Sequence, residues 1–312
     1  MTIAFIFPGQ GSQSLGMLAE LSAMEPVVAA TFREASDVLA YDLWALVQAG
    51  AETELNKTEI TQPAMLAAGV AVWRLWQAHQ GVSPVYLAGH SLGEYTALVC
   101  AGTLAFGDAV NLVAERGRLM QSAVPAGSGA MAAILGLDEV ALAGICLQSA
   151  EAEVVTCANL NAPGQIVIAG HKAAVERACA AAKAAGAKRA VLLPVSVPSH
   201  CALMQPAADG LAKRLGEIDL RPPTIPVIHN VDVDVHDAPA EIVDALVRQL
   251  SHPVRWIETV QRMVRGGVDT LVECGPGKVL TGLCKRIEKD ANCLAVHDPA
   301  SLQVALSATQ GA

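Results

Sequence analysis

The sequence predicts an α/β fold with a mainly parallel sheet and an inserted ferredoxin-like subdomain. Apolar runs of strand length alternate with helix-length periodic segments, which is typical of a parallel sheet covered by helices. The stretch from 130 to 195 instead reads strand, helix, strand, strand, helix, strand, which is the split βαβ order of a ferredoxin-like unit. A chain of 312 residues is long enough to give both units a packed core.

The predicted elements of the larger unit lie on both sides of that stretch. Strands are predicted near residues 3–7, 85–88, 226–229 and 270–273. Helices are predicted near residues 61–79, 91–101, 107–122, 202–216, 239–250 and 254–265. The large domain is therefore predicted to comprise residues 1–126 and 197–312.

The inserted subdomain is predicted to comprise residues 127–196. Its elements are strands at 130–136 and 188–195, helices at about 138–150 and 171–186, and two middle strands joined by a turn at 161–164. Hinges are predicted at Gly127 and Gly129 on one side, and at Pro194 and Pro198 on the other. A cleft between the two units is where we expect a ligand to bind.

Composition and charge exclude several classes of protein. Hydrophobic residues make up 53% of the chain and charged residues 16%, against roughly a quarter charged in ordinary soluble proteins. No apolar run reaches the ~18 residues of a membrane span, and the N-terminus lacks the basic segment of a signal peptide. We therefore expect a cytoplasmic protein that does not enter membranes. A net charge of −9 argues against nucleic-acid binding.

The eight cysteines give no sign of a metal site or a disulfide framework. They include no C-x-x-C pair, and their spacing fits neither zinc ligation nor a small disulfide-rich fold. We interpret them as reduced core residues. Cys201, although next to a histidine, is expected to be a small buried residue, because sequence neighbours do not face one another as a nucleophile and its base must.

The sharpest motif is "YLAGHSLGEY" at residues 86–95. A short apolar strand enters Gly89-His90-Ser91-Leu92-Gly93 and is followed by helix formers, which is the nucleophile elbow G-x-S-x-G in its strand–turn–helix context. Ser91 is the predicted nucleophile. The main-chain N–H of Leu92 is predicted to stabilise the oxyanion that forms on the attacked carbonyl. The motif predicts acyl transfer through a serine ester.

A serine nucleophile needs a base, and His200 is the preferred candidate among eight histidines. It lies just past the return from the inserted subdomain, on a loop that enters a helix. His90 adjoins Ser91 but points differently at a sharp turn, so we expect it to have a packing or positioning role. Three histidines are expected to be surface residues, namely His79, His171 and His236. The remaining rivals for the role of base are His229, His252 and His297.

Several motifs together resemble the malonyl-CoA:acyl-carrier-protein transacylases, most closely the discrete bacterial type of type II fatty-acid synthesis. The motifs, in order, are "FPGQGSQ" (7–13), "NKTEITQPA" (56–64), "GHSLGEY" (89–95), "NAPGQIVIAG" (161–170), "PSH" (198–200) and "GPGKVL" (275–280). The resemblance covers essentially the whole chain. It implies a hydrolase-like α/β core that carries a ferredoxin-like insert.

The resemblance also implies a reaction and a set of residues. Ser91 resembles the nucleophile, His200 the base, and Gln249 the glutamine near that histidine, whose carbonyl would fix the imidazole tautomer. Arg116 resembles the arginine that binds the malonyl carboxylate bidentately, although helix periodicity alone would place it on a solvated face. The implied ping-pong cycle moves malonyl from malonyl-CoA to an acyl carrier protein through malonyl-serine, with no cofactor and no metal.

The opening turn "FPGQGSQSLG" is interpreted as the second wall of the oxyanion hole. Its glycines miss the dinucleotide pattern G-x-G-x-x-G, because Ser14 stands at the third position and Pro8 interrupts the turn. The N–H of Gln10 would pair with that of Leu92, and the Gln10 side chain would lie near the acyl group. "GPGKVL" is likewise not a phosphate loop, because Val279 replaces the required serine or threonine. It is expected to join a strand to a helix.

An acidic carrier protein would need a local basic patch on this acidic chain, and three clusters remain open. They are Lys183, Lys188 and Arg189; Lys213 and Arg214; and Lys285, Arg286 and Lys289.

Three alternatives to this function also remain open. A serine thioesterase or esterase would use a late acid and histidine, such as Asp269 with His297. A non-catalytic carrier-binding protein would keep the fold only. A transacylase of a malonate decarboxylase or polyketide system would share the chemistry and differ in its carrier.

Overall fold

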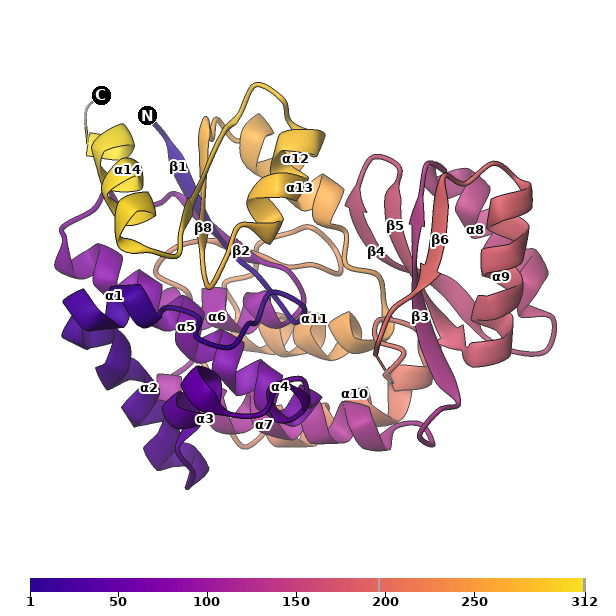
Figure 1. Ribbon diagram of the computed structural model, residues 1–312, viewed down its shortest axis with the longest axis horizontal. Helices are drawn as coiled ribbons and strands as arrows, with labels where there is room; N and C mark the ends of the chain where they lie inside the picture. The colour runs from indigo at the N-terminus through magenta and orange to yellow at the C-terminus, as the bar shows by residue number, and fades with distance from the viewer. Residues whose placement is uncertain (196, 311–312) are drawn as a thin grey trace.

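The computed structural model describes residues 1–195 and 197–310. The chain forms a large α/β lobe and a smaller lobe that contains a separate sheet (Figure 1). The predicted fold class is thus confirmed. Ser196, at the end of the predicted insert, and the last two residues of the chain lie outside the described residues.

The central sheet of the large lobe is parallel. Its strands stand in the order β7 (Val227–Ile228), β2 (Tyr86–Gly89), β1 (Ile3–Phe7), β8 (Thr270–Cys274) and β9 (Asn292–Val296). Because parallel strands end at the same edge, the loops that follow β1, β2 and β8 meet there. A Cβ built on Gly275, just after β8, would lie 2.6 Å from the Pro8 ring after β1.

Both faces of this sheet are buried, as β1 illustrates. Its five residues are all apolar and fully enclosed, which is typical of a central parallel strand. Phe5 points to the face covered by α5 (Thr58–Ala78), where its ring meets Trp73 and Trp76 edge-on at 5.5 and 5.1 Å. Ile6 points to the opposite face, where it packs with residues of α12 (Trp256–Arg265) and α13 (Val279–Ile287). Alternate residues of the strand therefore join two separate cores.

The other helices of the large lobe surround the sheet (Figure 1). They are α1 (Ala19–Met24), α2 (Pro26–Leu39), α3 (Leu43–Ala49), α4 (Glu52–Leu55), α6 (Leu92–Cys100), α7 (Phe106–Ser122), the 3₁₀ helix η1 (Ala202–Met204), α10 (Gln205–Leu215), α11 (Pro239–Ser251), α12 (Trp256–Arg265), α13 (Val279–Ile287) and α14 (Pro299–Gln310). Among the described residues, no helix combines the length and the apolar character that crossing a bilayer requires.

The smaller lobe contains an antiparallel sheet in the order β4 (Val155–Ala162), β5 (Gln165–His171), β3 (Gly129–Leu135), β6 (Arg189–Leu192). Its helices are α8 (Glu139–Ala150) and α9 (Lys172–Ala184), which share a core with the sheet. The predicted order of strands and helices is confirmed. The last strand is shorter than predicted, because it pairs with β3 only over residues 189–192.

The sequence patterns missed elements at both ends of the chain. Helices α1 to α4 fill residues 19–55, where no element is predicted, and β9 and α14 follow the last predicted strand. The buried stripe of α2 consists of Val28, Thr31, Phe32 and Ala35, so small and polar residues obscure its periodicity. Strand β9 pairs with β8 alone and lies at the sheet edge, where its apolar run is short.

Candidate active site

Ser91 lies in a strained turn between β2 and α6, as the elbow motif predicts. Its backbone angles are φ 52° and ψ −104°, a region that few residues other than glycine adopt. The flanking glycines leave no room for side chains: a Cβ on Gly89 would collide with the backbone of Gly93, and one on Gly93 with the carbonyl of Phe7. The turn therefore presents the Ser91 hydroxyl at the edge where the parallel strands end.

His200 is the histidine that reaches Ser91. Its Nε2 lies 2.7 Å from Ser91 Oγ, and its Nδ1 lies 2.8 Å from the main-chain oxygen of Gln249. Because a carbonyl can only accept, Nδ1 carries the proton and Nε2 offers its lone pair to the Ser91 hydroxyl. Burial, together with the nearby charge of Arg116, lowers the pKa of His200 to about 3. The ring is thus a neutral base at ordinary pH.

Arg116 reaches the same hydroxyl from α7. Its side chain is 1% exposed, which corrects the solvated position that helix periodicity suggests. Nη1 donates to Gln62 Oε1 at 2.8 Å, and Nη2 donates to Ser91 Oγ at 3.2 Å and to Gln249 Oε1 at 3.1 Å. The guanidinium also lies 5.2 Å above the Tyr95 ring. Within residues 1–195 and 197–310 it forms no ion pair, so its charge remains available to an anion.

Gln249 belongs to the site, but its side chain does not contact His200. The main-chain oxygen orients the imidazole, whereas the side-chain amide binds elsewhere. Its Nε2 donates to the Ser91 carbonyl oxygen at 3.0 Å and to Glu94 Oε2 at 2.8 Å, while its Oε1 accepts from Arg116. The carbonyl that was predicted to fix the imidazole tautomer is therefore the main-chain carbonyl of Gln249, not the carbonyl of its side-chain amide.

The sequence analysis missed a buried polar group beneath the elbow. Glu94 accepts from His229 Nδ1 at 2.8 Å and from the Asn230 N–H at 2.9 Å. Asn230 in turn accepts from the Ser91 N–H and donates to the Gly89 carbonyl, each at 2.7 Å. Their positions in the sequence could have pointed to these two residues. Glu94 lies inside the "GHSLGEY" motif, and Asn230 directly follows a predicted strand.

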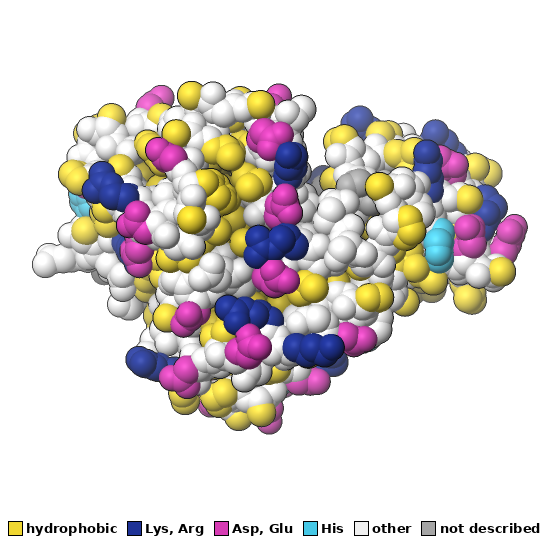
Figure 2. Space-filling view, turned by 90° about the horizontal axis from the view of Figure 1, so that it is seen from below, with side chains coloured by type: hydrophobic (Ala, Val, Ile, Leu, Met, Phe, Trp, Pro, Cys, Tyr) yellow, Lys and Arg dark blue, Asp and Glu magenta, His cyan; other side chains and the backbone are white. Residues whose placement is uncertain are grey.

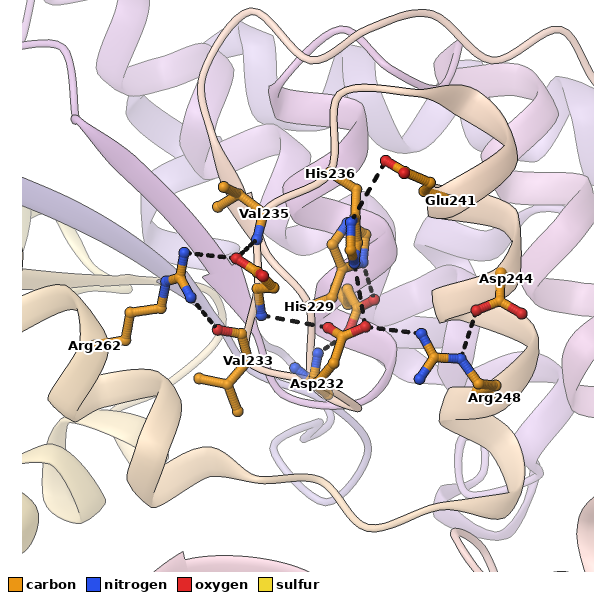
Figure 3. Close-up of polar contacts among 12 residues, drawn as sticks. His229, Asp232, Val233, Val235, His236, Glu241, Asp244, Arg248 and Arg262 are labelled. Atoms are coloured by element: carbon orange, nitrogen blue, oxygen red, sulfur yellow. Dashed lines mark hydrogen bonds and ion pairs between the residues drawn. The ribbon is translucent and has the colours of Figure 1, made fainter.

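Ion pairs at the surface hold the loop that carries His229 and Asn230 (Figure 3). Arg248 of α11 donates to Asp232 at 2.8 Å, and His236 Nε2 lies 3.1 Å from the same carboxylate. Arg262 of α12 donates to Asp234 and to the Val233 carbonyl, each at 2.7 Å. Two helices thereby fix the backbone on which Asn230 depends.

The predicted oxyanion donors lie on adjoining loops. A Cβ on Gly9 would collide with the carbonyl of His90 and would lie 3.6 Å from the nitrogen of Leu92, so the two turns are in contact. Within the described part of the chain, the N–H groups of Gln10 and Leu92 donate to no other group. The Gln10 side chain is exposed and donates to Thr58 Oγ1 at 3.3 Å.

The other histidines are engaged elsewhere. His90 Nε2 lies 2.8 Å from Asn161 Oδ1 of β4, which connects the elbow to the smaller lobe. His229 is fully buried against Glu94, and His252 is exposed. The alternative triad is not assembled, because His297 pairs with Asp298 at 3.3 Å and Asp269 accepts from the Thr2 N–H. The expected surface histidines are in fact half-buried: His79 pairs with Glu25, His171 accepts from the Val154 N–H and His236 pairs with Asp232.

Three further predictions concern ligands and loops. No group of histidine, cysteine or acidic side chains that could hold a metal ion occurs among the described residues. The turn after β8 joins it to α13, as predicted for "GPGKVL". Cys201 is buried and donates to the Pro198 carbonyl at 3.1 Å.

Charges of both signs lie together on the face of the molecule seen from below (Figure 2). Figure 2 shows basic and acidic side chains interspersed over the underside of the large lobe. A groove of about 480 Å³ between α7 and α10 has the same mixture. It is lined by Asn111, Glu115, Arg118, Gly210, Lys213, Arg214 and Glu217.

Comparison with known sequences gives full-length matches. The family model for the acyl transferase domain matches residues 4–300. The chain is 60% identical over 304 residues to the malonyl CoA-acyl carrier protein transacylase of Salmonella typhimurium, which covers 97% of this chain and 98% of that protein. It is 46% identical over 305 residues to the protein of the same name from Bacillus subtilis, covering 97% and 96%.

Comparison with solved structures agrees. An acyl carrier protein S-malonyltransferase from Vibrio cholerae superimposes with a TM-score of 0.96 at 60% identity, covering 97% of this chain and 99% of that one. A malonyl-transacylase in complex with a type II PKS acyl-carrier protein superimposes with a TM-score of 0.98 at 58% identity, covering 99% and 100%.

Proposed function

The chain belongs to the acyl transferase family, among the malonyl-CoA–acyl carrier protein transacylases, and from this premise we propose that Ser91 carries the malonyl group between two thiols. The enzyme transfers malonyl from malonyl-CoA to the phosphopantetheine thiol of an acyl carrier protein, which supplies fatty-acid elongation. The observation that carries the mechanism is the position of Ser91 Oγ, 2.7 Å from His200 Nε2 and 3.2 Å from Arg116 Nη2.

In the first half-reaction, Ser91 Oγ attacks the thioester carbonyl of malonyl-CoA while its proton moves to His200 Nε2. The tetrahedral intermediate collapses, the C–S bond breaks, and the leaving thiolate takes the proton from the imidazolium. The Gln249 carbonyl accepts from Nδ1–H throughout and so keeps the ring oriented. A thiolate leaves readily, so a neutral carbonyl suffices where amide hydrolysis uses a carboxylate.

In the second half-reaction, the thiol of the carrier protein replaces coenzyme A. Its proton passes to His200, the sulfur attacks the malonyl ester, and Ser91 Oγ recovers a proton as the C–O bond breaks. Both half-reactions form an oxyanion, for which the N–H groups of Gln10 and Leu92 are the proposed donors.

Arg116 is the proposed binding group for the free malonyl carboxylate. It is buried, charged and directed at Ser91 Oγ, where the acyl group becomes attached. A guanidinium binds a carboxylate through paired hydrogen bonds, and an acetyl group offers it none. The site therefore favours malonyl over acetyl.

Two further proposals concern organisation and location. Residues 127–196 are proposed to act as a subdomain that closes one side of the cleft, a role supported by the separate sheet and by the contact between Asn161 and His90. A cytoplasmic location is proposed, supported by eight cysteines that are all free thiols.

A polyketide carrier is the second candidate acceptor. It is favoured by the similarity to a malonyl-transacylase whose structure includes a type II PKS acyl-carrier protein. Loading rates for purified fatty-acid and polyketide carrier proteins distinguish the two acceptors.

The test of the covalent step is intact mass spectrometry after mixing with malonyl-CoA. We expect the wild-type chain to gain one malonyl group and Ser91→Ala to gain none. Ser122→Ala, an exposed serine on α7, is the matched control and should acylate normally. Acylation of the Ser91→Ala protein would overturn the assignment.

A further inference from the structure

The charge of Arg116 is buried without an adjacent carboxylate, and its counter-charge lies one side chain away. Arg116 Nη2 donates to Gln249 Oε1 at 3.1 Å, and Gln249 Nε2 donates to Glu94 Oε2 at 2.8 Å. Both charged side chains are essentially inaccessible, at 1% and 0% exposed. The amide dipole of Gln249 is thus aligned between a cation and an anion, with its oxygen toward the first and its nitrogen toward the second.

His229 also contacts Glu94, but it does not supply the balancing charge. Its Nδ1 lies 2.8 Å from Glu94 Oε1, and the ring is fully buried. Its Nε2 has no hydrogen-bond partner among the described residues. A protonated ring would leave a charged N–H unpaired in the interior, which is far more costly than an unpaired lone pair. The geometry therefore fits His229 as a hydrogen-bond donor to Glu94 rather than as its counter-charge.

We propose that Glu94 is the counter-ion of Arg116, acting through the Gln249 amide, and that it limits how tightly Arg116 binds the malonyl carboxylate. This inference rests on the proposed role of Arg116. In the empty site, Glu94 stabilises the buried guanidinium. Because the amide separates the two charges, Nη2 gives one hydrogen to Gln249 Oε1 and keeps the other directed at Ser91 Oγ, where the acyl group becomes attached. A carboxylate in direct contact would occupy that donor instead.

The same arrangement has a consequence for turnover. A malonyl carboxylate that reaches Arg116 also meets the repulsion of Glu94, so the acyl group is selected without being held too tightly to leave on the carrier. Glu94 is a positioning residue, since it touches neither the substrate nor the reacting atoms. Removing its charge should strengthen the binding of malonyl-CoA relative to acetyl-CoA, which is the opposite of what general damage to the site would do.

The test measures equilibrium binding in a protein that cannot turn over. In the Ser91→Ala background, calorimetry gives the Kd of malonyl-CoA and of acetyl-CoA, and their ratio is the malonyl preference. Adding Glu94→Gln should raise that preference about tenfold, because a repulsive charge close to the bound carboxylate is lost from a partly screened interior. An unchanged or reduced preference overturns the proposal.

Two controls separate this inference from the proposed function. Glu273 is a second fully buried carboxylate, held by the N–H groups of Leu280 and Thr281 and by the Thr281 hydroxyl, and among the described residues it has no hydrogen bond to Ser91, Arg116 or Gln249. Glu273→Gln should leave the malonyl preference unchanged. Arg116→Met should abolish the preference; if it does not, the carboxylate-binding role of Arg116 is wrong, whatever Glu94 does.

A stability cycle keeps the proposal testable if Glu94→Gln folds poorly. In Glu94→Gln, the buried charge of Arg116 has lost its counter-ion and destabilises the fold. Adding Arg116→Met removes that charge and should recover much of the lost thermal stability. Adding Arg116→Met to Glu273→Gln should give additive losses. Additive losses in the Glu94→Gln pair, or failure of that double variant to fold, would count against the counter-ion role.

Discussion

The main-chain oxygen of Gln249 orients His200, at 2.8 Å from Nδ1, while the Gln249 side chain turns away toward Arg116. One residue therefore serves two parts of the site through two different groups. The orientation of His200 depends on the position of the α11 backbone, whereas the orientation of Arg116 depends on the identity of the Gln249 side chain. Substitutions at this position should separate the two roles.

Gln249→Met should reduce malonyl transfer more than acetyl transfer. The variant keeps the main-chain carbonyl and the side-chain volume, but it removes one of the two acceptors of Arg116 Nη2 and leaves one hydrogen of that charged group unpaired. A lost hydrogen bond to a charged group corresponds to roughly ten- to hundredfold in kcat/KM. Steady-state kinetics with both substrates measures the difference, with Gln303→Met on the exposed face of α14 as the control. Equal losses for both acyl groups would contradict the division of roles.

The pH dependence of acylation should lack a step near the ordinary histidine pKa. Burial and the Arg116 charge lower the pKa of His200 to about 3, so the base is already neutral well below pH 6.5. Removing the cation in Arg116→Met should raise the pKa of His200 and move the acid limb of kcat/KM for acetyl-CoA to higher pH. Arg118→Met, on the exposed side of the same helix, should not move it. An acid limb that stays fixed in Arg116→Met would exclude this coupling.

Acid should destabilise the wild-type fold partly through His200. The pKa of His200 is 6.5 in the unfolded chain and about 3 in the folded chain. Between these pH values only the unfolded chain binds the proton, so the free energy of unfolding decreases as the pH falls from 6.5 to 3. The contribution is about 1.4 kcal/mol per pH unit from this group. Denaturant unfolding at pH 7 and pH 5 should show a smaller loss for His200→Gln than for the wild-type chain. The exposed His252→Gln is the control and should behave as wild type.

Asn230→Ala should destabilise the fold and slow acylation. The side chain accepts from the Ser91 N–H and donates to the Gly89 carbonyl, so its loss leaves one half-buried and one buried backbone group unpaired. The expected cost is roughly 2–4 kcal/mol. Thermal unfolding measures it against Asn111→Ala, whose side chain is exposed on α7. A stability within about 0.5 kcal/mol of wild type would show that Asn230 does not support the elbow.

Gly9→Ala should lower kcat through the proposed oxyanion hole. The added methyl group would collide with the His90 carbonyl and separate the turn that carries Gln10 from the turn that carries Leu92. Losing one oxyanion donor typically costs about a hundredfold in kcat. Gly282→Ala in α13, where a Cβ has open space, is the control. A normal kcat in Gly9→Ala would exclude the donor role of this loop.

The sequence predicted the parts of the fold and site that have local signatures. The elbow around Ser91 is defined by steric needs within five adjacent residues, and both sheets, apart from the edge strand β9, follow from the order of strands and helices. His200 was identifiable by its place after the insert. Helices α1, α3 and α4 are only 6, 7 and 4 residues long, too short for local periodicity to reveal, and the buried stripe of α2 includes Thr31 and Ala35.

The remaining parts of the site depend on distant contacts. Asn230 is separated from Ser91 by 139 positions in the chain, and Glu94 meets Gln249 across 155. Arg116 has the pattern of a surface residue until α5 packs against its helix and Gln249 of α11 accepts from its guanidinium. The fold, rather than the helix pattern, decides that this charge is buried.

The left-handed backbone at Ser91 also decides which hydroxyl amino acid can occupy the position. Threonine carries the same nucleophile, but its branched Cβ tolerates a φ of 52° poorly. His200, with a φ of 63°, imposes a similar demand on the base. The backbone conformation of the turn therefore favours serine over threonine, whatever the relative reactivity of the two hydroxyl groups. A threonine nucleophile at this position would require a turn with different backbone angles.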